Sequence, residues 1–235
     1  MKVLIIIPAF NEEANIVRVT DHLISDYPQF DYVIINDGSS DHTAEICREH
    51  GYRMIDHPVN LGLAGAVRTG MKYALENDYD AAIQFDGDGQ HRPEYIGAMA
   101  EKIAEGYDVV IGSRFVTEKK DGSLRMVGSR MIESFIRLTT GKKINDPTSG
   151  MRMYSRRIIR MLAADASLTP EPDTVAYLIR CGAKICEVQV HMDERIAGES
   201  YLNLRRAVQY MATVCISILL GGWFRDIKSL GEEAQ

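Results

Sequence analysis

The sequence predicts an α/β fold built on a doubly wound, mostly parallel β-sheet, and three observations predict it. The chain opens with an unbroken aliphatic run at residues 3–7, which is typical of a strand buried on both faces. Similar short runs alternate with helical patterns as far as about residue 115, as in repeated strand–helix units. Of the 235 residues, 46% are apolar and 26% are charged; these globular values exclude disordered, collagen-like and simple coiled-coil chains.

The first half of the chain supplies the regular alternation. After the first strand, further strands are expected at the apolar runs 32–35, 53–56, 81–85 and 109–111. The helices between them are expected at residues 12–25, 41–50, 63–75 and 93–105. Ser40 or Asp41 is the expected N-cap of the second helix, and Pro93 suits the first turn of the fourth.

The pattern changes in the second half. Residues 116–123 are polar and charged, and a helix is expected next at 124–140. Strands at 151–154 and 184–190, helices at 155–163 and 174–181, and a polar loop at 192–203 complete this part. We therefore expect one domain over residues 1–202, in two halves, 1–115 and 116–202, followed by a C-terminal helical extension over 203–235.

The C-terminal helix is expected at residues 203–224. Its apolar part, residues 211–224, is shorter than the roughly 20 residues that a membrane span needs. Basic residues flank this part, as in helices that lie on a membrane surface or pair subunits: Arg205, Arg206, Arg225 and Lys228. A simple core helix is the third interpretation, and the sequence leaves all three open.

Charge and cysteine usage restrict the partners and the compartment. The net charge is −6 and no basic tract is present, which argues against nucleic acid as the partner. The first apolar run is too short for a signal peptide, and the four cysteines show no metal or disulfide spacing. We expect reduced cysteines and a cytoplasmic protein, with peripheral contact at the cytoplasmic face of the membrane if the C-terminal helix binds lipid.

Three polar loops follow predicted strands, at residues 8–12, 36–41 and 86–91, and each carries at least one carboxylate. The carboxyl ends of parallel strands meet at one edge of a sheet, where ligands bind, so these loops are expected to converge. The glycine-rich strings of dinucleotide-binding and Walker-type loops are absent from the sequence. The sequence therefore disfavours a Rossmann dehydrogenase and a P-loop ATPase.

The triplet Asp86-Gly87-Asp88 is the sharpest local signal. Alternate residues of an extended segment point the same way, so both carboxylates can face one hard cation. A solvated turn is the simpler interpretation of such a triplet. The position of this one, at a strand end opposite two other acidic loops, favours a metal site.

Two further segments suit a nucleotide. Asp37 stands where a buried strand meets a Gly-Ser-Ser turn, and its carboxylate can accept a hydrogen bond from a nucleobase N–H. A helix-capping role fits Asp41 better, which leaves Asp37 available to a ligand. Residues 57–66 enter a helix through small side chains, a weak signal for phosphate at a helix N-terminus.

Several ordered motifs together resemble the GT-A fold glycosyltransferases of family two. The motifs are IIIPAFNEE, IINDGSSD, HPVNLGLAGAVRTG, FDGDGQH and IGSRF. Two more, DPTSGMRMYS and ERIAGESYLNL, resemble the polyprenyl-phosphate branch, the dolichol-phosphate mannosyltransferase type. The likeness covers about residues 2–205. Three positions depart from the usual pattern: Asn36 for Asp, Tyr201 for Lys, and an end without the transmembrane pair that many relatives carry.

The resemblance implies an inverting, metal-dependent transfer of a sugar from a UDP- or GDP-linked donor. Residues 1–115 would then be the nucleotide-sugar half and 116–202 the acceptor half. The implied donor-binding residues are Pro8, Ala9, Glu12, Asp37, Asn60, Gly62, Asp86, Gly87 and Arg114. The implied ligands of Mg²⁺ or Mn²⁺ are Asp88 with Gln90 and Asp86. Arg195 would close over the diphosphate, and Arg125 with Ser129 would hold an acceptor phosphate.

The acceptor decides whether a base is needed. A phosphate monoester is largely dianionic at neutral pH, since its second pKa is near 6, so it needs no general base. A glycan hydroxyl needs one, and Asp173 or Glu171 stands where family-two enzymes acting on glycans carry theirs. Both carboxylates also suit the cap of the following helix. We expect transfer to polyprenyl phosphate; glycan extension through Asp173 is the alternative, and a silent nucleotide-sugar-binding protein is a third hypothesis.

Overall fold

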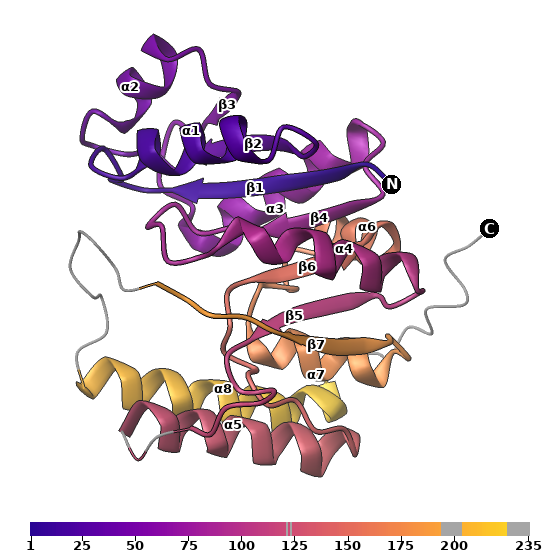
Figure 1. The fold of residues 1–235 in the computed structure, drawn as a ribbon. Coiled ribbons are helices and arrows are strands. Elements are labelled where there is room, and N and C mark those ends of the chain that lie inside the picture. Colours follow the sequence, from indigo (N-terminus) through magenta and orange to yellow (C-terminus); the bar gives the residue numbers. More distant parts are fainter. Residues whose placement is uncertain (121, 123, 194–203, 225–235) are drawn as a thin grey trace.

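The computed structural model describes residues 1–120, 122, 124–193 and 204–224 (Figure 1). Strands and helices alternate through the first part, as the sequence predicts. The strands are β1 Val3–Ala9, β2 Asp31–Asn36, β3 Met54–Asp56, β4 Ala81–Gln84 and β5 Val109–Ser113. The helices between them are α1 Ile16–Asp26, α2 Thr43–Glu49, α3 Gly62–Glu76 and α4 Ile96–Ala104, with a short 3₁₀ turn, η1 Pro93–Tyr95, before the last.

The second part contains the expected elements as well. They are α5 Leu124–Thr140, β6 Arg152–Ser155, α6 Arg156–Ala164, α7 Pro172–Arg180, β7 Ile185–Gln189 and α8 Leu204–Phe224. The predicted N-cap of α2 is off by one or two residues: His42 is the cap, and the Asp41 carboxylate accepts the Thr43 N–H at 3.0 Å. The proposed division into domains stays a prediction.

The seven strands form one sheet in the order β3-β2-β1-β4-β6-β5-β7. β6 runs antiparallel to both neighbours, β4 and β5, and the remaining pairings are parallel. The chain winds outward from β1 to β3 and then returns to place β4 on the other side of β1. The carboxyl ends of β1 and β4 therefore flank the point where the strand order reverses, which is where open α/β sheets bind ligands.

Two hydrophobic cores cover the two faces of this sheet, and β1 contributes to both. Leu4 and Ile6 pack with α3, α5, α6, α7 and α8 on one face. Ile5 and Ile7 pack with α1, α2 and α4 on the other. This explains the unbroken aliphatic run, because a strand covered on both faces has no polar side. A Cβ on Gly70 of α3 would lie 2.3 Å from Ile6 Cγ2, so α3 packs directly against β1.

Helices α5 and α8 lie side by side below β7 in Figure 1. Met211 of α8 occupies the space beside Gly128 of α5, where any side chain would clash. Val214, Cys215 and Ile218 bury the inner face of α8 in the core. In the part of the chain that the structure describes, no helix has the length and apolarity that crossing a membrane requires.

Candidate functional site

The three polar loops converge at the carboxyl edge of the sheet, as predicted. The loop after β1 and the loop after β2 are joined by side chains: Asn11 N–H donates to Ser39 Oγ at 3.0 Å, and Ser40 N–H donates to Asn11 Oδ1 at 2.8 Å. Glu12 N–H donates to Thr43 Oγ1 at 2.9 Å. The Asp37 N–H donates to the Ala9 carbonyl at 2.8 Å, so the loop with the predicted donor-binding residues Pro8, Ala9 and Glu12 starts beside Asp37.

The loop after β2 also packs against the start of α3. Gly38 has φ +67°, and a Cβ there would lie 2.7 Å from the backbone nitrogen of Asn60. Only glycine satisfies both conditions without strain. Asn60 Oδ1 in turn accepts the Gly62 N–H at 2.9 Å, which turns the chain into α3. Asn60 and Gly62 thus lie beside Asp37 and shape its surroundings.

Asp37 is almost fully buried in a network of hydrogen bonds. Its Oδ1 lies 2.9 Å from His57 Nδ1 and 2.9 Å from the Leu61 backbone nitrogen. His57 Nε2 lies 2.9 Å from Thr69 Oγ1 of α3. One carboxylate oxygen of Asp37 therefore has protein partners, although the sequence suggested that the whole group is available to a ligand.

The loop after β4 carries the predicted metal ligands. Gln90 N–H donates to Asp88 Oδ1 at 3.1 Å, which closes the turn. Asp86 N–H donates to Nδ1 of the buried His91 at 2.9 Å, so the imidazole carries its proton on Nε2 when neutral. That nitrogen lies 3.6 Å from Asp86 Oδ2. His91 therefore sets the conformation of the loop.

The Asp86 side chain contacts two other parts of the chain, the end of β4 and the segment before β6. Gln84 donates from Nε2 to Asp86 Oδ1 at 3.0 Å. Gly150 precedes the antiparallel strand β6, and a Cβ there would lie 2.9 Å from Asp86 Oδ2. A Cβ on the next residue, Gly87, would come within 3.1 Å of the Pro8 carbonyl oxygen. Asp86 is thus held between the β1 loop and the segment before β6.

The donor set suits a hard divalent cation. Asp86 and Asp88 supply carboxylate oxygens and Gln90 an amide oxygen, which are ligands that Mg²⁺ and Mn²⁺ prefer. In the described ranges no group of three or more His, Cys, Asp and Glu side chains could hold a metal alone.

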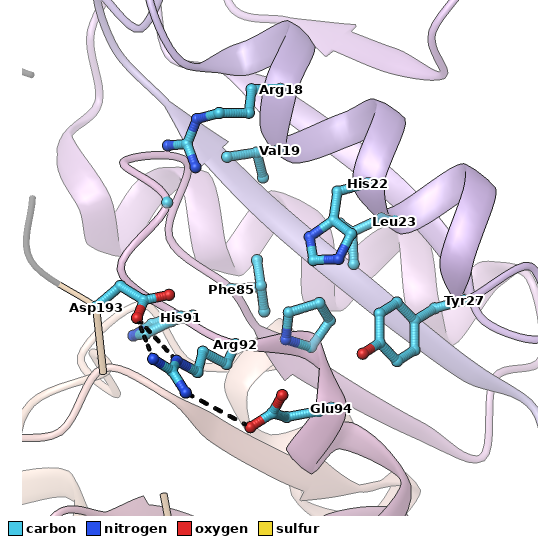
Figure 2. A pocket seen from close by; sticks show the side chains of 12 residues that line it. Arg18, Val19, His22, Leu23, Tyr27, Phe85, His91, Arg92, Glu94 and Asp193 are labelled. Carbon is cyan, nitrogen blue, oxygen red and sulfur yellow. Dashed lines mark hydrogen bonds and ion pairs between the residues drawn. The ribbon is translucent and has the colours of Figure 1, made fainter. Parts of the chain in front are cut away.

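A cavity of about 310 Å³ lies between α1 and residues 85–94, beside the loop after β4 that carries the predicted metal ligands and is called the metal loop below (Figure 2). Asp193 lines this cavity and joins the loop after β7 to the metal loop. Asp193 N–H donates to the Gln90 carbonyl at 2.9 Å, and Arg92 Nε donates to Asp193 Oδ1 at 2.8 Å. These contacts tie Gln90 to the loop after β7.

Arg114 follows β5 and binds a buried carboxylate. Its backbone N–H, Nε and Nη2 donate to Asp146 at 3.1, 2.7 and 2.9 Å. Asp146 is fully buried, and its own backbone N–H donates to Glu187 of β7 at 2.8 Å. Burial raises the pKa of Asp146, but the hydrogen bonds and charge of Arg114 outweigh it and hold that pKa below its ordinary value of 3.8.

The predicted acceptor residues lie on α5. Ser129 is buried and accepts a hydrogen bond from Lys120 Nζ at 3.0 Å, and the same ammonium lies 3.1 Å from Glu133. Arg125 belongs to the first turn of α5, and its side chain lies outside the described part. Arg195 lies in residues 194–203, which the structure does not describe. Lys120 is a cation at this position that the motifs did not indicate.

Asp173 and Glu171 face α8. Asp173 Oδ2 accepts a hydrogen bond from Ser217 Oγ at 2.6 Å, and Glu171 accepts one from Tyr210. Glu171 occupies the N-cap position of α7 without a side-chain capping bond. Glu171 therefore stands at the cap position that one interpretation predicted, but its carboxylate accepts the Tyr210 hydroxyl and not a backbone N–H of α7.

Comparison with known proteins decides the family. The sequence profile described as Glycosyl transferase family 2 matches residues 4–162. The chain belongs to this family. It is a glycosyltransferase, and the resemblance predicted from its motifs is confirmed.

Relatives of this family 2 glycosyltransferase include two named for polyprenyl-phosphate chemistry. It is 27% identical to a polyprenol monophosphomannose synthase of Mycolicibacterium smegmatis, covering 88% of this chain and 84% of the relative. It is 29% identical to an undecaprenyl-phosphate mannosyltransferase of Micrococcus luteus, with 86% and 88% covered. An uncharacterized protein of Methanocaldococcus jannaschii is 32% identical, with 80% of each chain covered.

A solved structure confirms the GT-A type fold. Glucosyl-3-phosphoglycerate synthase of Mycobacterium tuberculosis, in complex with Mn²⁺, UDP and glucosyl-3-phosphoglycerate, superposes with a TM-score of 0.66 at 19% identity. The match covers 94% of this chain and 79% of that one. At this identity the likeness concerns the fold.

Proposed function

We propose that this glycosyltransferase moves a sugar from a UDP- or GDP-linked donor to polyprenyl phosphate, in an inverting and metal-dependent reaction. The observation that carries the proposal is the convergence of Asp86, Asp88 and Gln90 with the Pro8 and Asp37 loops at the strand-order reversal. The solved neighbour that holds Mn²⁺ and UDP supports a cation and a nucleotide at such a site.

In the proposed mechanism, different loops bind the base, the metal and the acceptor. Asp37 binds the nucleobase, and the β1 loop with Asn60 and Gly62 surrounds the nucleoside. Asp86, Asp88 and Gln90 would hold Mg²⁺ or Mn²⁺, which neutralises charge on the departing diphosphate. An acceptor phosphate oxygen attacks the anomeric carbon opposite the diphosphate, so the configuration inverts. Arg125, Ser129 and the missed Lys120 are the proposed acceptor-phosphate residues, and Arg195 is proposed to close over the diphosphate.

A phosphate acceptor suits the surroundings of Asp173. The phosphate is already ionised at neutral pH and needs no base. The Asp173 carboxylate accepts a hydrogen bond from Ser217 and so has a structural use between α7 and α8. Two relatives named for transfer to polyprenyl phosphates support the same acceptor.

The direct test is release of nucleoside diphosphate from a panel of UDP- and GDP-sugars with Mn²⁺, with and without a short polyprenyl phosphate. We expect release that depends on the lipid phosphate and that Asp173→Asn leaves nearly unchanged. Release stimulated by a glycan alone, and abolished by Asp173→Asn, would contradict the proposal and support glycan extension. Donor binding without turnover on any acceptor would support a silent binding protein.

The lipid acceptor requires contact with a membrane surface, and we propose that α5 and α8 provide it. Large apolar side chains are exposed on both helices: Val127, Met131, Leu138, Ile216, Leu219 and Leu220. Leu138 is 75% exposed and Ile216 is 55% exposed, which is costly unless another apolar surface covers them. Arg130 lines the same surface as Val127, Met131 and Leu138, and Arg137 lies in the last turn of α5.

We expect the double variant Leu138→Glu/Ile216→Glu to lose sedimentation with anionic vesicles, because two charges would enter the apolar layer. Val59→Glu/Leu61→Glu is the matched control, since these residues are also exposed but lie before α3. Unchanged vesicle binding of the first variant would contradict this contact. A change from dimer to monomer in size-exclusion chromatography, without loss of vesicle binding, would assign the face to a second subunit.

A further inference from the structure

The ion pair between Arg92 and Asp193 carries an inference about a proposed metal ligand. We propose that Arg92 and Asp193 are positioning residues that act through Gln90: their ion pair keeps the Gln90 amide turned so that its oxygen, and not its nitrogen, is available to the cation. This inference rests on the proposed function, in which Gln90 is a ligand of Mg²⁺ or Mn²⁺.

The first step is the orientation of the Gln90 amide. Gln90 Nε2 donates to the backbone carbonyl of Asp193 at 3.3 Å. A carbonyl oxygen can only accept a hydrogen bond, so it selects the NH₂ end of the amide. Turning the amide over would place two oxygens together and would offer a hard cation a nitrogen in place of the oxygen that it prefers. Among the described residues, none donates a hydrogen bond to the amide oxygen Oε1, so that oxygen is available to a ligand.

The second step is what keeps the Asp193 carbonyl beside Gln90. Asp193 follows β7, and in the sheet β6 and β5 lie between β7 and β4, so strand pairing does not bring the two loops together. The Asp193 N–H donates to the Gln90 carbonyl at 2.9 Å. Arg92 Nε donates to Asp193 Oδ1 at 2.8 Å, and Arg92 Nη2 donates to the same oxygen. The main chain and the side chain of Asp193 are therefore both bound to residues 90–92.

The third step is that this ion pair acts locally. Val190, the residue after β7, is held independently of it, because the Val190 N–H donates to the Ser113 carbonyl at 2.9 Å. The Arg92 and Asp193 side chains are 39% and 47% exposed, and exposed ion pairs add little to the stability of a domain. The consequence of the pair is therefore to be found at Gln90, where the Asp193 backbone makes its bonds.

Asp193 is the principal carboxylate partner of Arg92. Glu94 Oε1 lies 3.8 Å from Arg92 Nη1, which is beyond hydrogen-bond range, whereas two nitrogens of Arg92 donate to Asp193. Hydrogen bonds between charged groups are stronger than those between neutral groups. Removing either member of the pair should therefore loosen the Asp193 carbonyl and let the Gln90 amide adopt both orientations.

The test is the affinity of the full chain for Mn²⁺ with UDP or GDP present, measured by electron paramagnetic resonance, which does not depend on turnover. We expect Arg92→Ala and Asp193→Ala each to raise the dissociation constant of Mn²⁺ roughly tenfold, the lower end of the effect of losing a group that orients a metal ligand. Arg92→Lys keeps a charged donor for Asp193 and should bind Mn²⁺ more tightly than Arg92→Ala. Arg48→Ala is the matched control, since it removes another exposed ion pair, with Asp56, outside the metal loop.

A double-mutant cycle with Gln90 distinguishes positioning from a general effect on the fold. Gln90→Ala removes the amide, so adding Arg92→Ala to it should not weaken Mn²⁺ binding further. The melting temperatures of Arg92→Ala and Asp193→Ala should stay near that of the unmodified protein, because both side chains are partly exposed.

The outcomes separate this inference from the proposed function. If Gln90→Ala weakens Mn²⁺ binding but Arg92→Ala and Asp193→Ala do not, the inference is overturned and the proposed metal site stands. If Arg92→Ala weakens Mn²⁺ binding by the same factor with and without the Gln90 amide, the pair does not act through Gln90, and the inference is overturned as well. If the unmodified protein binds no Mn²⁺ with either nucleotide, both the inference and the proposed metal-dependent reaction are overturned.

Discussion

Replacing Asp88 with alanine is expected to reduce the rate of sugar transfer by roughly 10²–10⁴-fold, because a cation on the leaving diphosphate supplies several kcal/mol of charge stabilisation. Asp88 is the proposed ligand at the middle of the metal loop, between Asp86 and Gln90. Nucleoside diphosphate release measures the rate. Mn²⁺ binding followed by electron paramagnetic resonance should weaken in parallel.

Asp88→Asn separates charge from loop structure, because its amide oxygen can still accept the Gln90 N–H that closes the turn. We expect Asp88→Asn to lose Mn²⁺ affinity while its melting temperature stays near that of the unmodified protein. Glu94→Gln is the matched control: Glu94 is an exposed acid close to the same loop, and it pairs with Arg92. Unchanged Mn²⁺ affinity in Asp88→Ala would remove Asp88 from the metal site.

The sequence predicted the strands and the strand-end loops well because both depend on local patterns. An aliphatic run such as β1 has one stable solution in an α/β fold, and carboxyl ends of parallel strands share an edge. The acidic side chains of the loops after β1, β2 and β4 were found for this reason.

The partners of those side chains could not be predicted because they are distant in the sequence. His57 contacts Asp37 from 20 residues away, Gly150 packs on Asp86 from before the antiparallel strand β6, and Asp193 reaches the metal loop from beyond β7. The sequence pattern suggests a helix cap or a general base for Asp173. Its hydrogen bond from Ser217 depends on how α8 packs against α7, which the pattern does not indicate. Burial of polar residues is settled by tertiary packing, which periodicity does not encode.

Asp146→Ala is expected to lower the free energy of unfolding by about 3–5 kcal/mol, because it leaves the Arg114 guanidinium without its buried partner. Three donors of Arg114 bind this fully buried carboxylate. Such a loss is a large part of the about 5–15 kcal/mol that stabilises a typical domain. Urea unfolding followed by circular dichroism measures it. Glu105→Ala, at an exposed pair with Lys102, should change the stability by less than about 1 kcal/mol.

The pH dependence of the free energy of unfolding in acid gives a second test of this prediction. The pKa of Asp146 is depressed in the folded state, so its contribution is present above the ordinary value of 3.8 and is lost as pH falls below it toward the folded pKa. The stability difference between the unmodified protein and Asp146→Ala should therefore be constant from neutral pH to about pH 5 and shrink in stronger acid. A difference that stays constant throughout would mean that lost packing, and not the ion pair with Arg114, accounts for the loss of stability.

Asp146→Ala should also weaken Mn²⁺ binding under conditions where the variant remains folded. Asp146 precedes the segment in which Gly150 packs against Asp86, so its loss is expected to disturb that contact.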